Sequence, residues 1–206
     1  MAISRRGYQP KKRNTGIRER KRIVLLATEG NNKTETLYFR KFPTANFVVR
    51  FARGNYTDPV NMINALSAEY EENCDPSEGD IGYCLIDADT DPAKNRKIEM
   101  ADGKSNDHIS VIVSAPCFEI WYLCHFTAST HQYTSNEEVL STLRRYIPNY
   151  RKESAGIAEL IADKTDEAIA NAQRLEKHCL EKGACAHTVS FSPSTEIYKI
   201  VSLLKK

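Results

Sequence analysis

Four short runs of mainly apolar residues limit the folds open to this chain of 206 residues. Each run has five to seven residues, which suits a strand buried on both faces and is too short for a helix. Segments with helical features follow the first three runs. Strands that alternate with helices predict an α/β fold, with a mostly parallel central sheet of about four strands flanked by helices. The runs cover residues 22–28, 47–51, 81–86 and 108–113.

The second half of the chain has a mainly helical pattern. Helices are predicted over 116–126, 136–147 and 164–181. A last helix is predicted with Ser192 as its cap and Pro193 in its first turn, because the apolar residues that follow recur at helical spacing. These helices form a C-terminal extension to the α/β core.

The first 22 residues are strongly basic. They hold nine Lys or Arg residues and one acid, for a charge of +8, whereas the other 20 basic and 26 acidic residues give −6. A basic arm on an acidic body favours contact with nucleic-acid phosphates. The alternative is a solvated tail or one that docks on an acidic partner. The arm residues assigned to nucleic acid are Arg5, Arg6, Lys11, Lys12 and Arg13.

Three parts follow from these patterns. We expect a flexible basic arm over 1–22, an α/β core over 23–113 and a helical extension over 114–206. The composition, 41% hydrophobic and 27% charged, is that of a globular protein. No apolar run approaches the roughly 18 residues that a membrane span needs, and no signal-peptide pattern is present. Six cysteines without a C-x-x-C pair suggest reduced thiols, so we expect a cytoplasmic protein.

Acidic residues follow two of the predicted strands. Glu29 comes directly after the first, and Asp87, Asp89 and Asp91 stand at alternate positions at the end of the third. In parallel sheets the ligand crevice lies at the carboxyl ends of the strands, so we expect these side chains to meet. Clustered carboxylates are commonly held by a cation, and Mg²⁺ or Mn²⁺ suits oxygen ligands. The alternative is that the acids cap the helix that begins at Pro92, which Asp91 fits well.

Glu29 stands next to Gly30, which permits a close backbone approach. The helix that follows would point its N-terminus at the same crevice, where phosphate binds favourably. A carboxylate beside a metal can act as a general acid or base. Simple helix capping by Glu29 is the alternative.

Glu119 lies in a segment whose other residues are nearly all apolar. A buried, unpaired carboxylate is destabilising by several kcal/mol, so Glu119 needs a partner, exposure or a function. His125 is six residues further, about 240° around an ideal helix, and so does not share a face with Glu119. A structural role is the favoured interpretation of His125.

Five motifs stand in this order along the chain: Glu29-Gly30 with Lys33-Thr34-Glu35 and Tyr38-Phe39, Asp87-x-Asp89, Ser114 to Trp121 with His125-Phe126, Tyr150-x-Lys152, and Pro193-Ser-Thr195. Taken together, these motifs resemble the RloB-like family, whose members have a Toprim-type fold. The segment Ser114 to Trp121 is the longest matching motif, and the order of all five motifs is also that of the family. Ala115 and Ser192 stand where the family usually has Asn, so an amide role at position 115 is lost.

The resemblance implies a metal-dependent, Toprim-type nuclease of a bacterial anti-phage defence system, with an ABC/AAA-like ATPase as partner. It implies that Glu29 acts as acid and base, that Asp87 and Asp89 hold Mg²⁺ or Mn²⁺, and that Asp91 is a further ligand. Lys152 is the candidate for contacting a substrate phosphate. Family positions without an assigned role, counted as possible support for the site, are Lys33, Glu35, Glu119 and His125.

The predicted function is therefore cleavage of DNA or RNA, and two alternatives stay open. One is a phosphatase of the haloacid-dehalogenase type, because Asp87-x-Asp89-Thr90 follows a strand; its motif needs Thr or Val where Asp91 stands. The other is a non-catalytic nucleic-acid-binding or regulatory subunit that acts with a partner ATPase.

Overall fold

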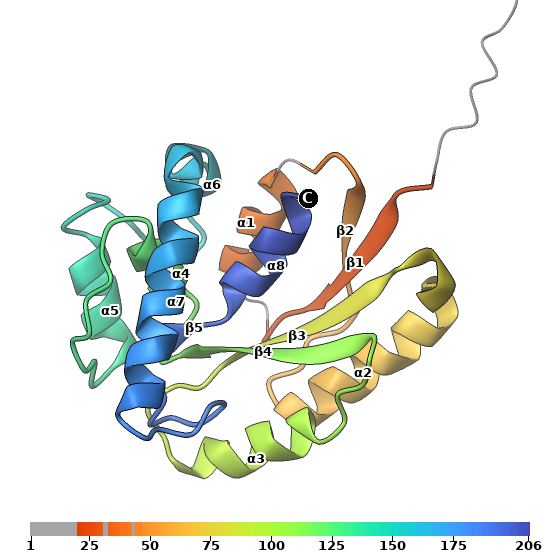
Figure 1. Ribbon diagram of the computed structural model, residues 1–206, viewed down its shortest axis with the longest axis horizontal. Helices are drawn as coiled ribbons and strands as arrows, with labels where there is room; N and C mark the ends of the chain where they lie inside the picture. Colours follow the sequence, from red (N-terminus) through yellow and green to blue (C-terminus); the bar gives the residue numbers. More distant parts are fainter. Residues whose placement is uncertain (1–19, 31–32, 43) are drawn as a thin grey trace, which may run out of the picture.

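The computed structural model describes residues 20–30, 33–42 and 44–206. A five-stranded sheet in the order β2-β1-β3-β4-β5 forms the centre (Figure 1). The first four strands pair in parallel, and the short β5 pairs antiparallel with β4. The predicted α/β class and mostly parallel sheet are confirmed, with one more strand than expected. The strands are β1 (Arg22–Ala27), β2 (Phe47–Phe51), β3 (Ile81–Asp87), β4 (Ile109–Ala115) and β5 (Ser194–Thr195).

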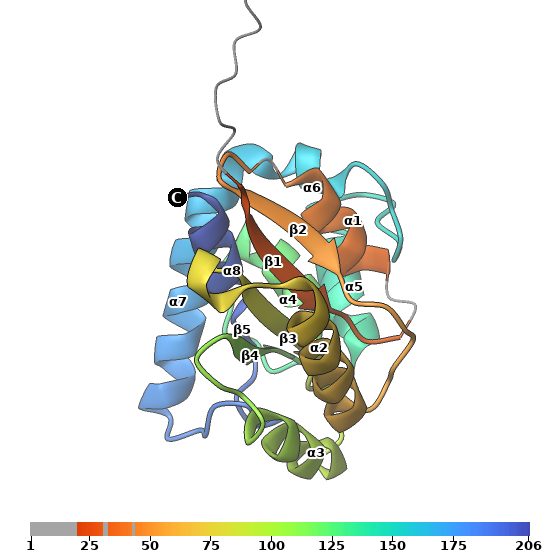
Figure 2. The ribbon, with the colours of Figure 1, turned by 90° about the vertical axis from the view of Figure 1, so that its right-hand side faces the viewer.

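Helices cover both faces of the sheet. In the views of Figures 1 and 2, α2 and α3 lie on one face, and the other face carries α1, α4, α7 and α8. The helices are α1 (Lys33–Lys41), α2 (Pro59–Asn73), α3 (Ala93–Asp102), α4 (Glu119–Cys124), α5 (Asn136–Leu143), α6 (Ile157–Leu160), α7 (Thr165–Glu181) and α8 (Ile197–Leu204). This arrangement agrees with the expected Toprim-like fold.

The side chains of β1 alternate between the two layers. Val24 and Leu26 pack in the cluster with α1, α4 and α8, whereas Ile23 and Leu25 pack with α2 and α3. None of the four is more than 4% exposed. Burying one such side chain stabilises the fold by about 1.5–3 kcal/mol, which explains why a continuous apolar run forms a central strand. Trp121 of α4 is fully buried at the centre of the first layer.

Two predicted helix starts are wrong. The helix expected from Pro116 begins at Glu119, because the Pro116 carbonyl instead accepts a hydrogen bond from the Asp89 N–H at 2.8 Å. The helix expected from Ser192 and Pro193 begins at Ile197.

Before α8 begins, the chain forms the short strand β5. Thr195 pairs with Ser114, and their hydroxyl oxygens lie 2.8 Å apart. The carboxylate of Glu196 accepts the Val113 N–H at 3.0 Å. The free edge of β4 therefore finds its hydrogen-bond partners in the segment that was expected to be a helical turn.

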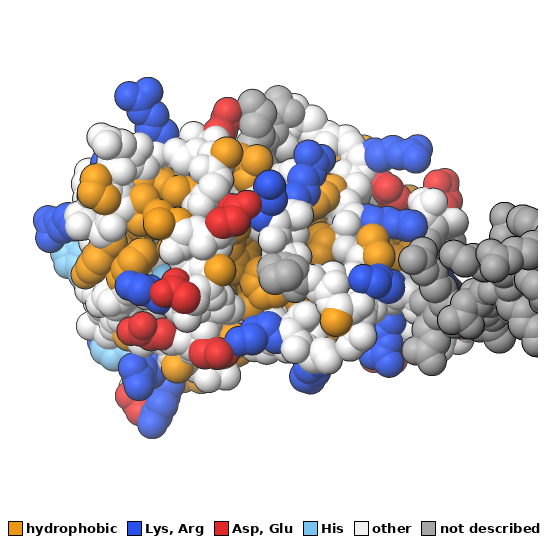
Figure 3. All heavy atoms as spheres, turned by 90° about the horizontal axis from the view of Figure 1, so that it is seen from above, with side chains coloured by type: hydrophobic (Ala, Val, Ile, Leu, Met, Phe, Trp, Pro, Cys, Tyr) orange, Lys and Arg blue, Asp and Glu red, His pale blue; other side chains and the backbone are white. Residues whose placement is uncertain are grey.

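The predicted nucleic-acid residues of the arm, Arg5, Arg6, Lys11, Lys12 and Arg13, lie outside the described residues. In the described part, Arg20, Lys21, Arg22 and Lys206 help to line a hollow of about 610 Å³ where β1 begins. Figure 3 shows Lys and Arg side chains spread over the face seen from above. Among the helices of the described residues, none has the length and apolar character needed to cross a bilayer.

A candidate metal centre at the strand ends

The carboxyl ends of β1 and β3 lie side by side because these strands are parallel neighbours. Asp87 is the last residue of β3, and Glu29 stands in the turn after β1. Both open into a hollow of about 350 Å³, lined by Glu29, Gly30, Thr57, Asp87, Asp89, Asn136 and Lys152. The structure thus brings together four residues that the sequence singles out: Glu29, Asp87, Asp89 and Lys152.

Gly30 shapes the turn that presents Glu29. Its φ of +60° lies in the left-handed region, which glycine adopts without the strain that a side chain brings. Its N–H donates to the Tyr56 carbonyl at 2.6 Å. The turn is therefore anchored to the loop between β2 and α2, and Glu29 is held at the rim of the hollow.

The segment after β3 is held by the end of β4. The Ala88 N–H donates to the Ser114 carbonyl, and the Asp89 N–H donates to the Pro116 carbonyl, each at 2.8 Å. Asp89 has a φ of +56°, a left-handed conformation that is uncommon outside glycine but that Asp tolerates better than most residues. This backbone geometry directs the second carboxylate of Asp87-x-Asp89 into the hollow.

The ammonium group of Lys94 lies between Glu29 and Asp89. It donates to the two oxygens of Glu29 at 2.9 and 3.2 Å and to Asp89 Oδ2 at 2.7 Å. Burial lowers the pKa of Lys94, but the hydrogen bonds to Asp89 and Glu29 outweigh this and raise the pKa above its usual value. The Asn136 amide donates to the other Asp89 oxygen at 3.0 Å. Two carboxylates thus converge on one positive charge.

This convergence allows the residues to be tested against a metal ion. Carboxylate oxygens are the ligands that Mg²⁺ and Mn²⁺ prefer, and Glu29 and Asp89 already share one cation. Across the described ranges, however, no three Asp, Glu, His or Cys side chains are grouped closely enough to hold a metal ion. The donor chemistry fits, and Asp87, which lines the same hollow as Glu29 and Asp89, is the third carboxylate available to a metal ion.

Two more carboxyl groups lie near Asp87. Glu35 of α1 is 3% exposed and Glu119 of α4 is 1% exposed. Burial, reinforced by the negative charges of Glu35 and Glu119, raises the pKa of Asp87 well above its usual value. Burial likewise raises the pKa of Glu35 to about 8. The hollow is therefore backed by acidic groups whose ionisation is unfavourable unless positive charge is near.

Glu119, the buried acid that the sequence left without an explanation, has partners in the structure. The Tyr150 hydroxyl donates to Glu119 Oε1 at 3.2 Å. At the mouth of the hollow, burial lowers the pKa of Lys152, but the charge of Glu119 outweighs this and raises it. Lys152 is thus a permanent cation beside Glu119, Asp87 and Glu35.

Among the side chains that the structure describes, the centre holds more carboxyl groups than cations. We call it the acidic group, which comprises Glu29, Glu35, Asp87, Asp89 and Glu119. Within the described residues, Lys94 and Lys152 are cations that interact with the acidic group. A site with this balance attracts further positive charge.

The other residues proposed from the sequence have different positions. Asp91 Oδ1 accepts the Ala93 N–H at 2.9 Å and so caps the start of α3; it also lines a second hollow of about 300 Å³ beside Lys94. His125 Nδ1 lies 2.9 Å from the Trp121 carbonyl, and burial lowers the pKa of His125 to about 4. His125 is thus a neutral, structural histidine. The side chain of Lys33 lies outside the described part.

Two residues of the centre, Lys94 and Asn136, were not expected from the sequence. Lys94 stands in the first turn of α3, where acidic residues are favoured and a lysine is unusual. That position was the available signal for Lys94. Asn136 is 47 residues from Asp89 in the sequence, and nothing local distinguishes it from an ordinary residue after a helix cap.

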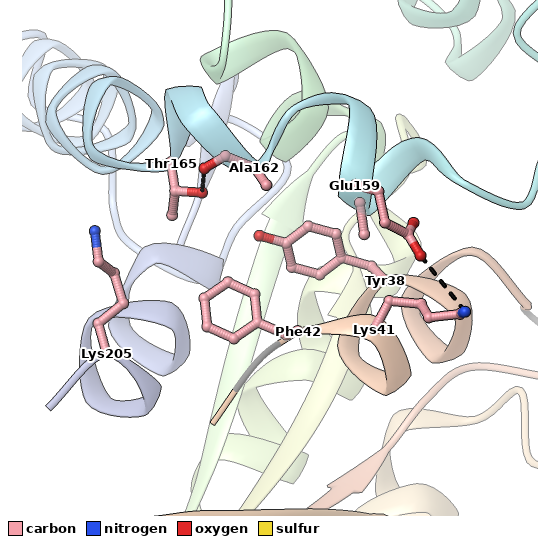
Figure 4. Close-up of a pocket in the computed structure, with 8 residues that line it drawn as sticks. Tyr38, Lys41, Phe42, Glu159, Ala162, Thr165 and Lys205 are labelled. Atoms are coloured by element: carbon pink, nitrogen blue, oxygen red, sulfur yellow. Dashed lines mark hydrogen bonds and ion pairs between the residues drawn. The ribbon is translucent and has the colours of Figure 1, made fainter. Parts of the chain in front are cut away.

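A larger hollow, of about 410 Å³, is separate from this centre (Figure 4). It lies between α1, α6 and α8 and is lined in part by Tyr38, Phe42 and Lys205. Lys41 and Glu159 form an ion pair of 3.5 Å across it, as drawn in Figure 4. No member of the acidic group lines it.

Comparison with protein families matches residues 24–204 to the description "RloB-like protein". No curated protein and no solved structure matches the chain. The matched range spans nearly the whole described structure and includes every member of the acidic group. The chain therefore belongs to the RloB-like protein family.

Proposed function

We propose that this protein is a nuclease that cleaves phosphodiester bonds in DNA or RNA and depends on Mg²⁺ or Mn²⁺. Glu29, Asp87 and Asp89 would hold the metal ion, with Asp91 as a further candidate ligand. The observation that carries the proposal is the convergence of Glu29 and Asp89 on one cation, beside Asp87, at the carboxyl edge of a parallel sheet. The Toprim-type resemblance of the same residues supports it.

When bound, a divalent ion supplies a Lewis acid for the phosphodiester and lowers the pKa of a water molecule. Glu29, at the rim of the hollow, would accept the proton of the attacking water and return it to the leaving oxygen. Asp87 and Asp89 would orient the site through the rigid end of β3. Lys152 lines the same hollow and would stabilise negative charge on the substrate phosphate.

The basic surface where β1 begins supports a nucleic-acid substrate. Lys21, Arg22 and Lys206 line it, and Lys21 and Arg22 belong to the basic stretch of the sequence over 1–22. Clustered Lys and Arg side chains bind the phosphate backbone without regard to base sequence. This surface would anchor the nucleic acid while the acidic group acts on one phosphodiester.

The biological setting is a further part of the proposal and rests on the family resemblance. We propose that the protein is a cytoplasmic effector of a bacterial anti-phage defence system and acts with an ABC/AAA-like ATPase. Such a partner would gate a nuclease that is otherwise harmful to its own cell.

The test is cleavage of plasmid, single-stranded DNA and tRNA in Mg²⁺, Mn²⁺ or EDTA, with and without the partner ATPase. We expect cleavage that requires the metal and is abolished by Glu29→Gln or Asp87→Asn, with circular dichroism showing an intact fold. Glu181→Gln, an exposed acid on α7, is the matched control and should cleave like wild type. Full activity in Glu29→Gln or Asp87→Asn, or cleavage in EDTA, would contradict the assignment.

A second candidate function is a non-catalytic, nucleic-acid-binding or regulatory subunit. One observation favours it: Lys94 already pairs with Glu29 and Asp89, the carboxylates that a metal ion would need. Salt-sensitive binding of nucleic acid, with no cleavage even when the ATPase is present, would decide for this alternative.

A further inference from the structure

Lys94 occupies the position where the two rim carboxylates of the centre meet. Its Nζ lies 2.9 Å from Glu29 Oε2 and 2.7 Å from Asp89 Oδ2. The side chains of Lys94 and Glu29 are 13% and 22% exposed, so the ammonium group is largely enclosed, whereas Asp89 is 40% exposed. A divalent ion bound by the same oxygens would stand about 2.0–2.6 Å from them, which overlaps the place of the ammonium group.

An ammonium group and a divalent ion cannot share this place. Two cations that close repel strongly, and each needs the same oxygens of Glu29 and Asp89. One must leave before the other binds.

The surroundings of Lys94 allow its side chain to move while the helix stays in place. On α3, Ile98 and Ala101 are fully buried in the core. Asn95 accepts the Val189 N–H at 2.8 Å, which fixes the next residue of the helix. Lys94 lines the hollow of about 300 Å³ together with Glu29, Asp89 and Asp91, and this hollow has room for a displaced side chain. Release of Lys94 therefore requires only side-chain rotation.

We infer that Lys94 competes with the divalent ion for Glu29 and Asp89. In the metal-free protein it is a positioning residue that holds the two carboxylates together; metal binding expels it from their oxygens into the rest of the hollow of about 300 Å³. The inference rests on the metal site of the proposed function. It adds that Lys94, a residue of the chain itself, sets the concentration of free metal ion at which the site fills.

The first experiment is a titration of the full-length protein with Mn²⁺, in which free Mn²⁺ is measured by electron paramagnetic resonance. Lys94→Met removes the competing charge while keeping an unbranched side chain, and we expect it to bind Mn²⁺ at least about tenfold more tightly than wild type. The matched control is Lys97→Met. Lys97 is one turn further along α3, pairs with Asp58 at 3.0 Å and is 57% exposed, so its loss should change the affinity by less than about twofold.

A second measurement uses the wild-type protein and does not depend on the folding of a variant. Acetylation of lysines by an amine-reactive reagent, followed by mass spectrometry, reports the access to each ammonium group. We expect Lys94 to be protected in EDTA and to become reactive at saturating Mn²⁺, while the reactivity of Lys97 is unchanged.

The outcomes separate this inference from the proposed function. Saturable binding with equal affinity in wild type and Lys94→Met, or continued protection of Lys94 in the metal-bound protein, would overturn the competition and leave the metal site standing. Weaker binding in Lys94→Met would also overturn it. No saturable Mn²⁺ binding in either protein would overturn both the metal site and the inference.

Discussion

Glu35 provides a test of the electrostatics of the centre that does not depend on catalysis. Its side chain lies in the first turn of α1 and is 3% exposed. Burial, together with the negative charge of Glu119, raises the pKa of Glu35 from 4.5 to about 8. The folded protein therefore binds a proton at Glu35 over a range of pH in which the unfolded chain has lost it.

The sign and size of the effect follow from this difference in proton binding. The unfolded state binds fewer protons than the folded state between pH 4.5 and about 8, so the free energy of unfolding falls by about 1.4 kcal/mol per pH unit as the pH rises. The loss from this group is about 3 kcal/mol at pH 7 and approaches about 5 kcal/mol above pH 8. Gln carries no proton to lose, so Glu35→Gln should avoid the penalty.

The assay is urea unfolding in EDTA, followed by circular dichroism, at pH values from 4.5 to 9. We expect Glu35→Gln to match wild type near pH 4.5 and to exceed its stability by about 3 kcal/mol at pH 7. Glu71→Gln, an exposed acid on α2, is the control and should show no comparable trend. A stability difference that does not change with pH, or a variant less stable than wild type at pH 8, would refute the reasoning.

Two other buried carboxylates, which are not members of the acidic group, give further predictions. Asp80→Ala should lower the free energy of unfolding by about 3 kcal/mol, because the N–H groups of Ile23 and Asp75 lose acceptors at 2.7 and 2.8 Å; a loss below about 1 kcal/mol in urea unfolding would contradict this. A hydrogen bond to Glu196 raises the pKa of His187, so the stability it confers is present at low pH and is lost as the pH rises through the folded-state value. Urea unfolding of His187→Gln should therefore show a larger loss at pH 6 than at pH 9, and equal losses would disprove the linkage.

The sheet was largely predictable from the sequence, because buried parallel strands need continuous apolar runs and β1 and β3 have them. The short β5 was not, because Ser194 and Thr195 are polar and join the sheet only through pairing with β4, about 80 residues earlier. Backbone pairing of that kind leaves no local pattern. The start of α4 at Glu119 depends in the same way on a contact between distant segments.

The residues of the candidate centre likewise differ in whether the sequence predicts them. Glu29 and Asp87 were predictable because parallel topology brings strand ends to one edge, and a residue at a strand end can be recognised in the sequence. The role of Lys94 was not predictable, because its partner Glu29 is 65 residues away and lysines on helices are commonly exposed. The contact between Tyr150 and Glu119 spans 31 residues and depends on how the helical extension folds back.

Crystals grown with Mn²⁺ and measured near the manganese absorption edge provide the most direct test of the metal centre. The account predicts an anomalous peak within about 2.5 Å of carboxylate oxygens from Glu29, Asp87 and Asp89, with the Lys94 side chain turned away from them. Saturating Mn²⁺ with no anomalous peak at these carboxylates, or a peak bound elsewhere on the chain, would contradict it.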